Sequence, residues 1–170
     1  MASLIDSLID DLDKENIEYE KLLELSKDKT SAIVKGDVEH LQEVFVKEQK
    51  LIDSINDVEK KRIADVADIC NVLHLPAEEI KVEQIVGILE KRPKEHDALQ
   101  EAYLKLKRTI EQLSKINDNN KMLLKESMDM IEFELNLAKN AVMAPQTGTY
   151  GKGAYEDQSM AGARGFDAKQ

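Results

Sequence analysis

The chain has 170 residues and a mass of 19.2 kDa, which is the size of one domain and excludes two catalytic domains. Charged residues make up 34% and aromatic residues only 4%, a composition typical of long amphipathic helices rather than of sheets. The formal net charge of −10 repels phosphate backbones and anionic lipid headgroups, so no nucleic acid is expected as a partner. The sequence therefore predicts an all-α protein.

The acidic start of the chain and its single cysteine indicate the cellular compartment. Asp6, Asp10 and Asp11 precede any basic residue, which argues against a signal peptide. No apolar run approaches the roughly 20 residues that span a bilayer, so no membrane insertion is expected. Cys70 alone can form neither a disulfide nor a zinc knuckle within one chain. We expect a cytoplasmic protein.

Apolar residues recur every three or four positions from the start of the chain and predict a first helix over residues 2–35. Glu15, Ser26 and Lys29 interrupt its apolar stripe. Gly36 is predicted to end this helix, and Asp37 to cap the N-terminus of the next. So short a connection makes the two helices antiparallel neighbours. The stripe itself consists of Ile5, Leu8, Leu12, Tyr19, Leu22 and Ile33.

The second predicted helix covers residues 38–73, and a short third helix covers residues 82–91 and closes the end of the hairpin. In the second helix, Glu48, Glu59 and Arg62 fill the polar positions of the expected seam, the stripe of residues that packs against a neighbouring helix. Its apolar positions are Leu41, Phe45, Ile52, Ile55, Val66, Ile69 and Leu73.

Pro93 introduces the longest predicted helix, over residues 94–142, since no further proline or glycine occurs until Pro145. Two asparagines, Asn117 and Asn120, lie in its seam. They either fix the register of the packing or mark where the helix leaves its partners, and register is the favoured interpretation. The rest of the seam is Leu99, Tyr103, Leu106, Ile110, Leu113, Leu124, Met128, Ile131, Leu135, Ala138 and Val142.

The last part of this helix carries more apolar surface than one seam requires. A second stripe lies about 120° around the helix and consists of Leu123, Met130, Phe133, Leu137 and Ala141. Flexible methionine side chains suit a surface that accepts varied apolar partners. Either the first two helices each cover one of the two stripes, or the second stripe binds another protein.

Residues 1–143 are therefore predicted to form a single, elongated helical-bundle domain, an antiparallel hairpin with coiled-coil packing. Residues 144–170 hold five of the seven glycines and cannot build a core, which predicts a flexible tail.

The titratable residues do not indicate an enzyme. No histidine has a glutamate three residues before it, so the paired Glu-x-x-His ligands of helical di-iron sites are absent. Cys70 follows Ile69 on an apolar face and is expected to be a packed hydrophobic residue rather than a nucleophile. We predict no catalytic residue, no metal site and no cofactor.

Three segments, in order along the chain, resemble the FlgN-type flagellar export chaperones, which serve the hook-filament junction proteins. The first runs from Gly36-Asp37-Val38-Glu39-x-Leu41 through Glu48-Gln49 to Glu59-Lys60-Lys61-Arg62. The second and most specific is Leu113-x-x-x-Asn117-x-x-Asn120-x-x-Leu123-Leu124-x-x-Ser127. The third is Pro145 followed by Tyr150-Gly151-x-Gly153.

This resemblance implies a chaperone that binds the terminal amphipathic helix of unassembled junction proteins, prevents premature assembly and delivers them to the export gate. It further implies that Tyr150 and Gly151 dock on the cytoplasmic domain of that gate. The expected client-binding residues are Leu123, Leu124, Met128, Met130, Ile131, Phe133 and Leu137. The alternative is a structural or tethering coiled coil whose second stripe mediates a homodimer.

Overall fold

Four α-helices and one short 3-10 helix make up the part of the chain that the structure, a computed structural model, describes: residues 2–75 and 80–143. Helix α1 spans Ala2–Lys35 and α2 spans Val38–Leu73. Helix α3, Val82–Ile88, continues into the 3-10 helix η1, Leu89–Lys91. Helix α4 spans Pro93–Met143. The predicted all-α class is confirmed.

The chain divides into two units, Met1–Phe133 and Glu134–Gln170. The first unit holds α1, α2, α3, η1 and α4 as far as Phe133. Of the second unit the structure describes residues 134–143, the last turns of α4, whose side chains are all exposed. The predicted flexible tail, with Tyr150 and Gly151, lies outside the described residues.

The turn between α1 and α2 has the caps that the sequence predicts. Gly36 adopts a positive φ of 67°, which glycine accommodates without strain, and its amide donates to the Ile33 carbonyl at 3.1 Å. Asp37 caps α2 by accepting a hydrogen bond from the backbone amide of His40 at 3.0 Å. The His40 ring also lies 2.9 Å from Asp28 of α1, and this hydrogen bond, with the negative charge of Asp28, raises the pKa of His40.

The core is thickest at the end where α3 lies and thins toward the Gly36 turn. At the α3 end, Ile5 of α1, Ile69 of α2 and Leu99 of α4 are all fully buried. Ile85 of α3 closes this end of the hairpin. The cluster nearer the turn is much smaller and consists of Leu22, Leu23, Ile55 and Leu113, with Tyr19, Leu51 and Ile116 packed against it.

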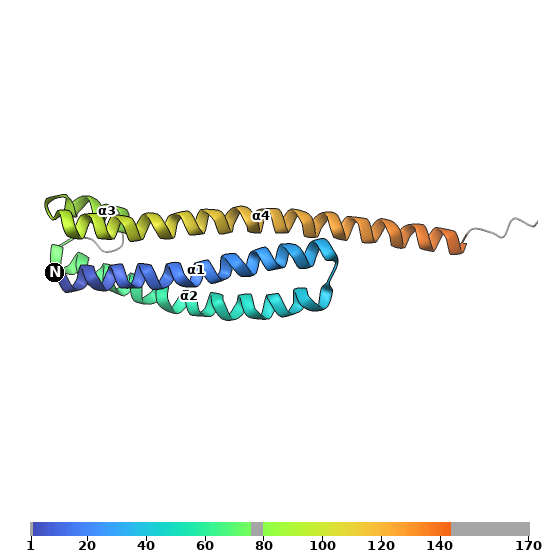
Figure 1. Cartoon of the computed structure of the whole chain (residues 1–170), viewed down its shortest axis with the longest axis horizontal. Helices are drawn as coiled ribbons and strands as arrows, with labels where there is room; N and C mark the ends of the chain where they lie inside the picture. Colours follow the sequence, from blue (N-terminus) through green and yellow to red (C-terminus); the bar gives the residue numbers. More distant parts are fainter. Residues whose placement is uncertain (1, 76–79, 144–170) are drawn as a thin grey trace, which may run out of the picture. The chain divides into compact units, whose positions relative to one another are not determined.

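Helices α1 and α2 form the closely packed pair, and α4 runs alongside them in the same direction as α1 (Figure 1). Three side-chain hydrogen bonds define this parallel register. The Thr109 hydroxyl donates to Asn16 at 2.7 Å, the Ser26 hydroxyl donates to Asn117 at 3.2 Å, and the Thr30 hydroxyl donates to Asn120 at 2.6 Å.

The polar residues that interrupt the stripe of α1 are paired with polar residues of the neighbouring helices. Glu15 accepts from the Arg62 guanidinium at 2.7 Å, and the Lys29 ammonium lies 2.8 Å from Glu48. These charges are largely buried and are compensated within the bundle, so the interruptions are compatible with close packing.

The predicted seam of α4 is correct at Leu99, Leu106 and Leu113, which are buried, and at Tyr103, which packs half-buried against the large core cluster. It is wrong at Ile110, which is 38% exposed. The residue buried there is Thr109, one position earlier. Hydrophobicity favours Ile110, but the hydrogen bond of Thr109 to Asn16 suits the interface with α1 better.

The same shift of one residue occurs on α2. Phe45 and Ile52 were expected in the seam but are 46% and 41% exposed, whereas Val44 is fully buried and Leu51 packs against the small cluster. Beyond Leu124, the expected seam residues Met128, Ile131, Leu135, Ala138 and Val142 are exposed as well. This half of the stripe is therefore not packed within the described chain, and the alternative, that it is shared with a client, stays a prediction.

Candidate protein-binding surface

Asn120 is the last residue of α4 that is fully buried against α1, with only 2% of its surface exposed. Its amide group donates to the Ser26 carbonyl at 2.9 Å and its oxygen accepts from the Thr30 hydroxyl, so both ends of the side chain are satisfied. Asn117, one turn earlier, accepts from the Ser26 hydroxyl. Helix α4 runs unbroken through both residues.

After Asn120, helix α4 carries apolar side chains that other helices do not bury. Leu123 and Leu124 are half-buried. From Met128 to Phe133, the end of the first unit, both apolar stripes are open to solvent. The exposed fractions lie between 56% and 68% for Met128, Met130, Ile131 and Phe133. This part of α4 continues past the Gly36 turn, where the hairpin of α1 and α2 ends (Figure 1). In the second unit, Leu137 is 53% exposed. We define the α4 apolar surface, within the first unit, as Leu123, Leu124, Met128, Met130, Ile131 and Phe133.

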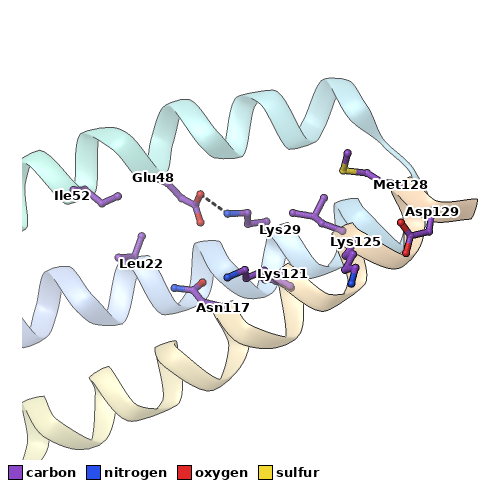
Figure 2. Close-up of a pocket in the computed structure, with 11 residues that line it drawn as sticks. Leu22, Lys29, Glu48, Ile52, Asn117, Lys121, Lys125, Met128 and Asp129 are labelled. Carbon is purple, nitrogen blue, oxygen red and sulfur yellow. Dashed lines mark hydrogen bonds and ion pairs between the residues drawn. The ribbon is translucent and has the colours of Figure 1, made fainter. Parts of the chain in front are cut away.

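A hollow of about 510 Å³ lies at the base of this surface, between α2 and α4 (Figure 2). Its lining includes Leu22 and Lys29 of α1, Glu48 and Ile52 of α2, and Leu124 and Met128 of α4. Lys29 and Glu48 form an ion pair within it (Figure 2). The side chains Lys121, Lys125 and Asp129 line the α4 side. The hollow thus offers apolar contacts with charged groups beside them.

The histidine and cysteine residues in the described part of the chain do not gather into a metal site. No group of three or more histidine, cysteine, aspartate or glutamate residues in this part of the chain could hold a metal ion. Cys70 is fully buried in the large core cluster, as expected for a packed hydrophobic residue. His40 binds Asp28, His96 binds Asp97 at 2.9 Å, and His74 ends α2 in a left-handed conformation.

The one strongly buried carboxylate with a perturbed pKa has a structural role. Burial raises the pKa of Glu15, and the positive charge and hydrogen bond of Arg62 only partly oppose this effect. Arg62 also donates to Glu59 at 3.2 Å, so a guanidinium joins two carboxylates within the hairpin. Such a network fixes the packing of α1 against α2 and keeps the Glu15 carboxylate paired.

The sequence alone missed Asn16, Thr30 and Thr109, which complete the polar contacts between α1 and α4. The available signal was the spacing of polar residues along α1 at Asn16, Ser26 and Thr30, which the apolar stripe obscured. In the described part of the chain, no helix combines the length and apolar character needed to cross a membrane.

A helical bundle that exposes an apolar helix surface defines a protein that binds other proteins. Residues 1–157 match the family described as FlgN protein, and the chain belongs to this family. The chain is also similar to the "Uncharacterized protein YvyG" of Bacillus subtilis (strain 168), with 25% identity over 131 residues, which cover 77% of this chain and 78% of the relative. No solved structure matches the chain. The resemblance to FlgN-type proteins is thus confirmed, and membership of this chaperone family makes the chain a flagellar export chaperone in general terms.

Proposed function

We propose that this chaperone binds the terminal amphipathic helix of unassembled hook-filament junction proteins through the α4 apolar surface. The observation that supports this proposal most directly is the exposure of Met130 and Phe133, at 64% and 62%, on a helix in an otherwise acidic, charged protein. Exposed apolar side chains gathered on one helix are typical of a binding surface, since water does not favour them.

The mechanism is competitive burial. While the α4 apolar surface covers the client helix, that helix cannot associate with other subunits, and assembly waits until the client is released. Four of the six methionines fall between residues 122 and 143, and flexible thioethers adapt to more than one client helix; they are Met122, Met128, Met130 and Met143. Specific binding of this kind needs an interface of roughly 1,200–2,000 Å².

Delivery to the export machinery is the second part of the proposal. Tyr150 and Gly151, which resemble the Tyr-Gly motif of the family, dock on the cytoplasmic domain of the flagellar export gate. Both residues lie outside the described part of the chain, so this part of the proposal depends on the sequence resemblance alone. The chaperone acts in the cytoplasm, where its clients are synthesised, without a cofactor and without catalysing a reaction.

The substitution Phe133→Asp tests the client-binding surface. It places a charge on an exposed position, so we expect wild-type thermal stability but loss of binding to labelled terminal-helix peptides of the junction proteins encoded in the same genome. Val34→Asp is the matched control, because Val34 is 71% exposed on α1 and lies outside the surface. Unfolding of the Phe133→Asp protein, or binding equal to that of the control, would refute the assignment of Phe133.

The alternative, a tethering coiled coil that homodimerises through the same surface, is separated by sedimentation. A monomer that forms a one-to-one complex with a junction protein supports the chaperone mechanism. A stable dimer that ignores these clients and is disrupted by Phe133→Asp supports the alternative.

A further inference from the structure

Helices α2 and α4 both carry apolar residues that stay at least partly open to solvent. On α4 these are Tyr103, Ile110 and Leu124, which are spaced at multiples of seven residues and so share one face of the helix. Tyr103 packs half-buried against the large core cluster, Leu124 is half-buried, and Ile110 is 38% exposed. On α2 the corresponding residue is Ile52, which is 41% exposed. Heptad spacing on a helix is the pattern that packs against another helix.

These residues line two hollows, each bounded by residues of α1, α2 and α4. Besides the hollow shown in Figure 2, a second of about 380 Å³ lies nearer to α3, and its lining includes Arg62 of α2 with Tyr103 and Ile110 of α4. Helix α1 contributes buried residues to both hollows, Leu12 and Glu15 to one and Leu22 to the other. On the face that holds the two hollows, residues of α2 and α4 therefore flank buried residues of α1.

The length of the face fits a helix of ordinary size. The stripe from Tyr103 to Leu124 extends over 21 residues, or roughly 30 Å at 1.5 Å per residue. In a bundle of four helices, the fourth helix would occupy the position between α2 and α4. The three long helices of this chain leave that position open.

Unpaired lysines on α4 give this face a local charge opposite to that of the whole protein. Lys107, Lys121 and Lys125 line the two hollows, and within the described residues none of them forms an ion pair, although the net charge of the chain is −10. Lys107 instead lies 6.0 Å from the ring of Tyr103. The neighbouring carboxylates are Glu111 and Asp129, while Glu15 and Glu48 are already paired with Arg62 and Lys29. A partner with acidic residues beside its apolar stripe complements this surface.

We propose that the face between α2 and α4 binds a fourth helix, which the client supplies. The client helix is amphipathic, and acidic residues flank its heptad apolar stripe. This inference rests on the proposed function and extends it, because it places the bound helix along the bundle as well as on the α4 apolar surface. The apolar stripe of the client contacts Ile52, Ile110 and Leu124, and its acidic residues face Lys121 and Lys125.

Site-specific crosslinking locates the bound helix. The photoreactive residue p-benzoylphenylalanine is introduced singly at Ile52 or Ile110, and at Ile17 as a control that is 48% exposed on α1 and lines neither hollow. The probe is the labelled terminal-helix peptide of each junction protein encoded in the same genome. We expect crosslinks to the peptide from positions 52 and 110 and none above background from position 17. Equal yields at all three positions would overturn the proposal, as would crosslinks between two chaperone chains, which would mean that a second copy occupies the face.

Charge reversal tests the predicted chemistry of the client without touching the core. Lys121→Glu and Lys125→Glu are exposed changes that should leave the fold intact, and together they should weaken peptide binding at least tenfold at low salt and flatten its salt dependence. Lys115→Glu makes the same charge change on α4 outside the hollows and should have little effect.

The outcomes separate this inference from the proposed function. If Phe133→Asp abolishes binding while the lysine variants behave like Lys115→Glu, the client occupies only the α4 apolar surface and the fourth-helix position is wrong. If the wild-type protein binds none of the peptides and none of the full-length junction proteins, the proposed function fails, and this inference fails with it.

Discussion

Asn120 shows how one polar residue determines the alignment of α4 on α1. Its amide fits only where the Ser26 carbonyl and the Thr30 hydroxyl lie within hydrogen-bond distance, at 2.9 and 2.6 Å. If α4 were displaced by one turn, the amide of Asn120 would lose both of these partners, at a cost of about 1–3 kcal/mol. We therefore propose that Asn117 and Asn120 fix register, the first of the two roles considered for them.

The substitution Asn120→Ala should lower the free energy of unfolding by about 1–3 kcal/mol, because it removes two hydrogen bonds between α4 and α1 and a buried side chain. Urea denaturation monitored by circular dichroism measures this difference. Asn119→Ala is the matched control on the exposed side of the same turn and should change stability by less than about 0.5 kcal/mol. Equal stability of the two variants would show that the buried amide does not contribute to register.

At the scale of the elements, local signals were sufficient to predict the helices but not the contacts between them. Gly36, Asp37 and Pro93 mark helix ends by backbone chemistry that acts within a few residues, and the structure has the same ends. Which residues of α2 and α4 face α1 depends on the α1 residues that they contact. Choosing Ile110 over Thr109 required knowledge of Asn16, 93 residues away in sequence.

The surplus of apolar residues late in α4 was predictable for a related reason, whereas their role in binding stays a prediction. Met128, Met130 and Phe133 stand out because apolar residues occupy more of the helix surface than one seam needs, a surplus that the sequence shows directly. The position of the hollow beside Leu124 could not be predicted, because it depends on where α2 lies relative to α4. The sequence places Phe45 and Ile110 in the packed seams, and only the structure shows that both side chains are exposed.

The exposed part of α4 should be the least stable part of that helix. Within the unit Met1–Phe133, the side chain of Asn120 makes the last hydrogen bonds from α4 to α1. The side chains of the following turns are mostly exposed. We expect fast amide exchange between Met122 and Val142 in the free protein and slow exchange when a client peptide is bound, while residues 99–113 stay protected in both states. Strong and equal protection of both segments without a client would contradict this expectation.

At the scale of the first unit, the distribution of the core separates a stable end from a weaker one. The large cluster near α3 joins residues of all four helices, whereas the cluster near the turn contains only Leu22, Leu23, Ile55 and Leu113. Opening of a folded protein begins where few apolar contacts must be broken. The weaker end is also the end that carries the hollow and the start of the α4 apolar surface, so local opening there would not require the α3 end to unfold.

Two substitutions on α4 test this gradient with the same chemical change. Leu99→Ala removes a fully buried side chain from the large cluster and should cost about 2–5 kcal/mol of global stability, with faster amide exchange throughout α1, α2 and α3. Leu113→Ala removes a 6% exposed side chain from the small cluster and should speed exchange mainly around Leu23 and Ile55, leaving the amides near Ile69 at wild-type rates. Native-state hydrogen exchange with urea denaturation measures both effects. If Leu113→Ala accelerates exchange near Ile69 as much as Leu99→Ala does, the bundle opens as one cooperative unit, and the turn end has no separate stability that client binding could use.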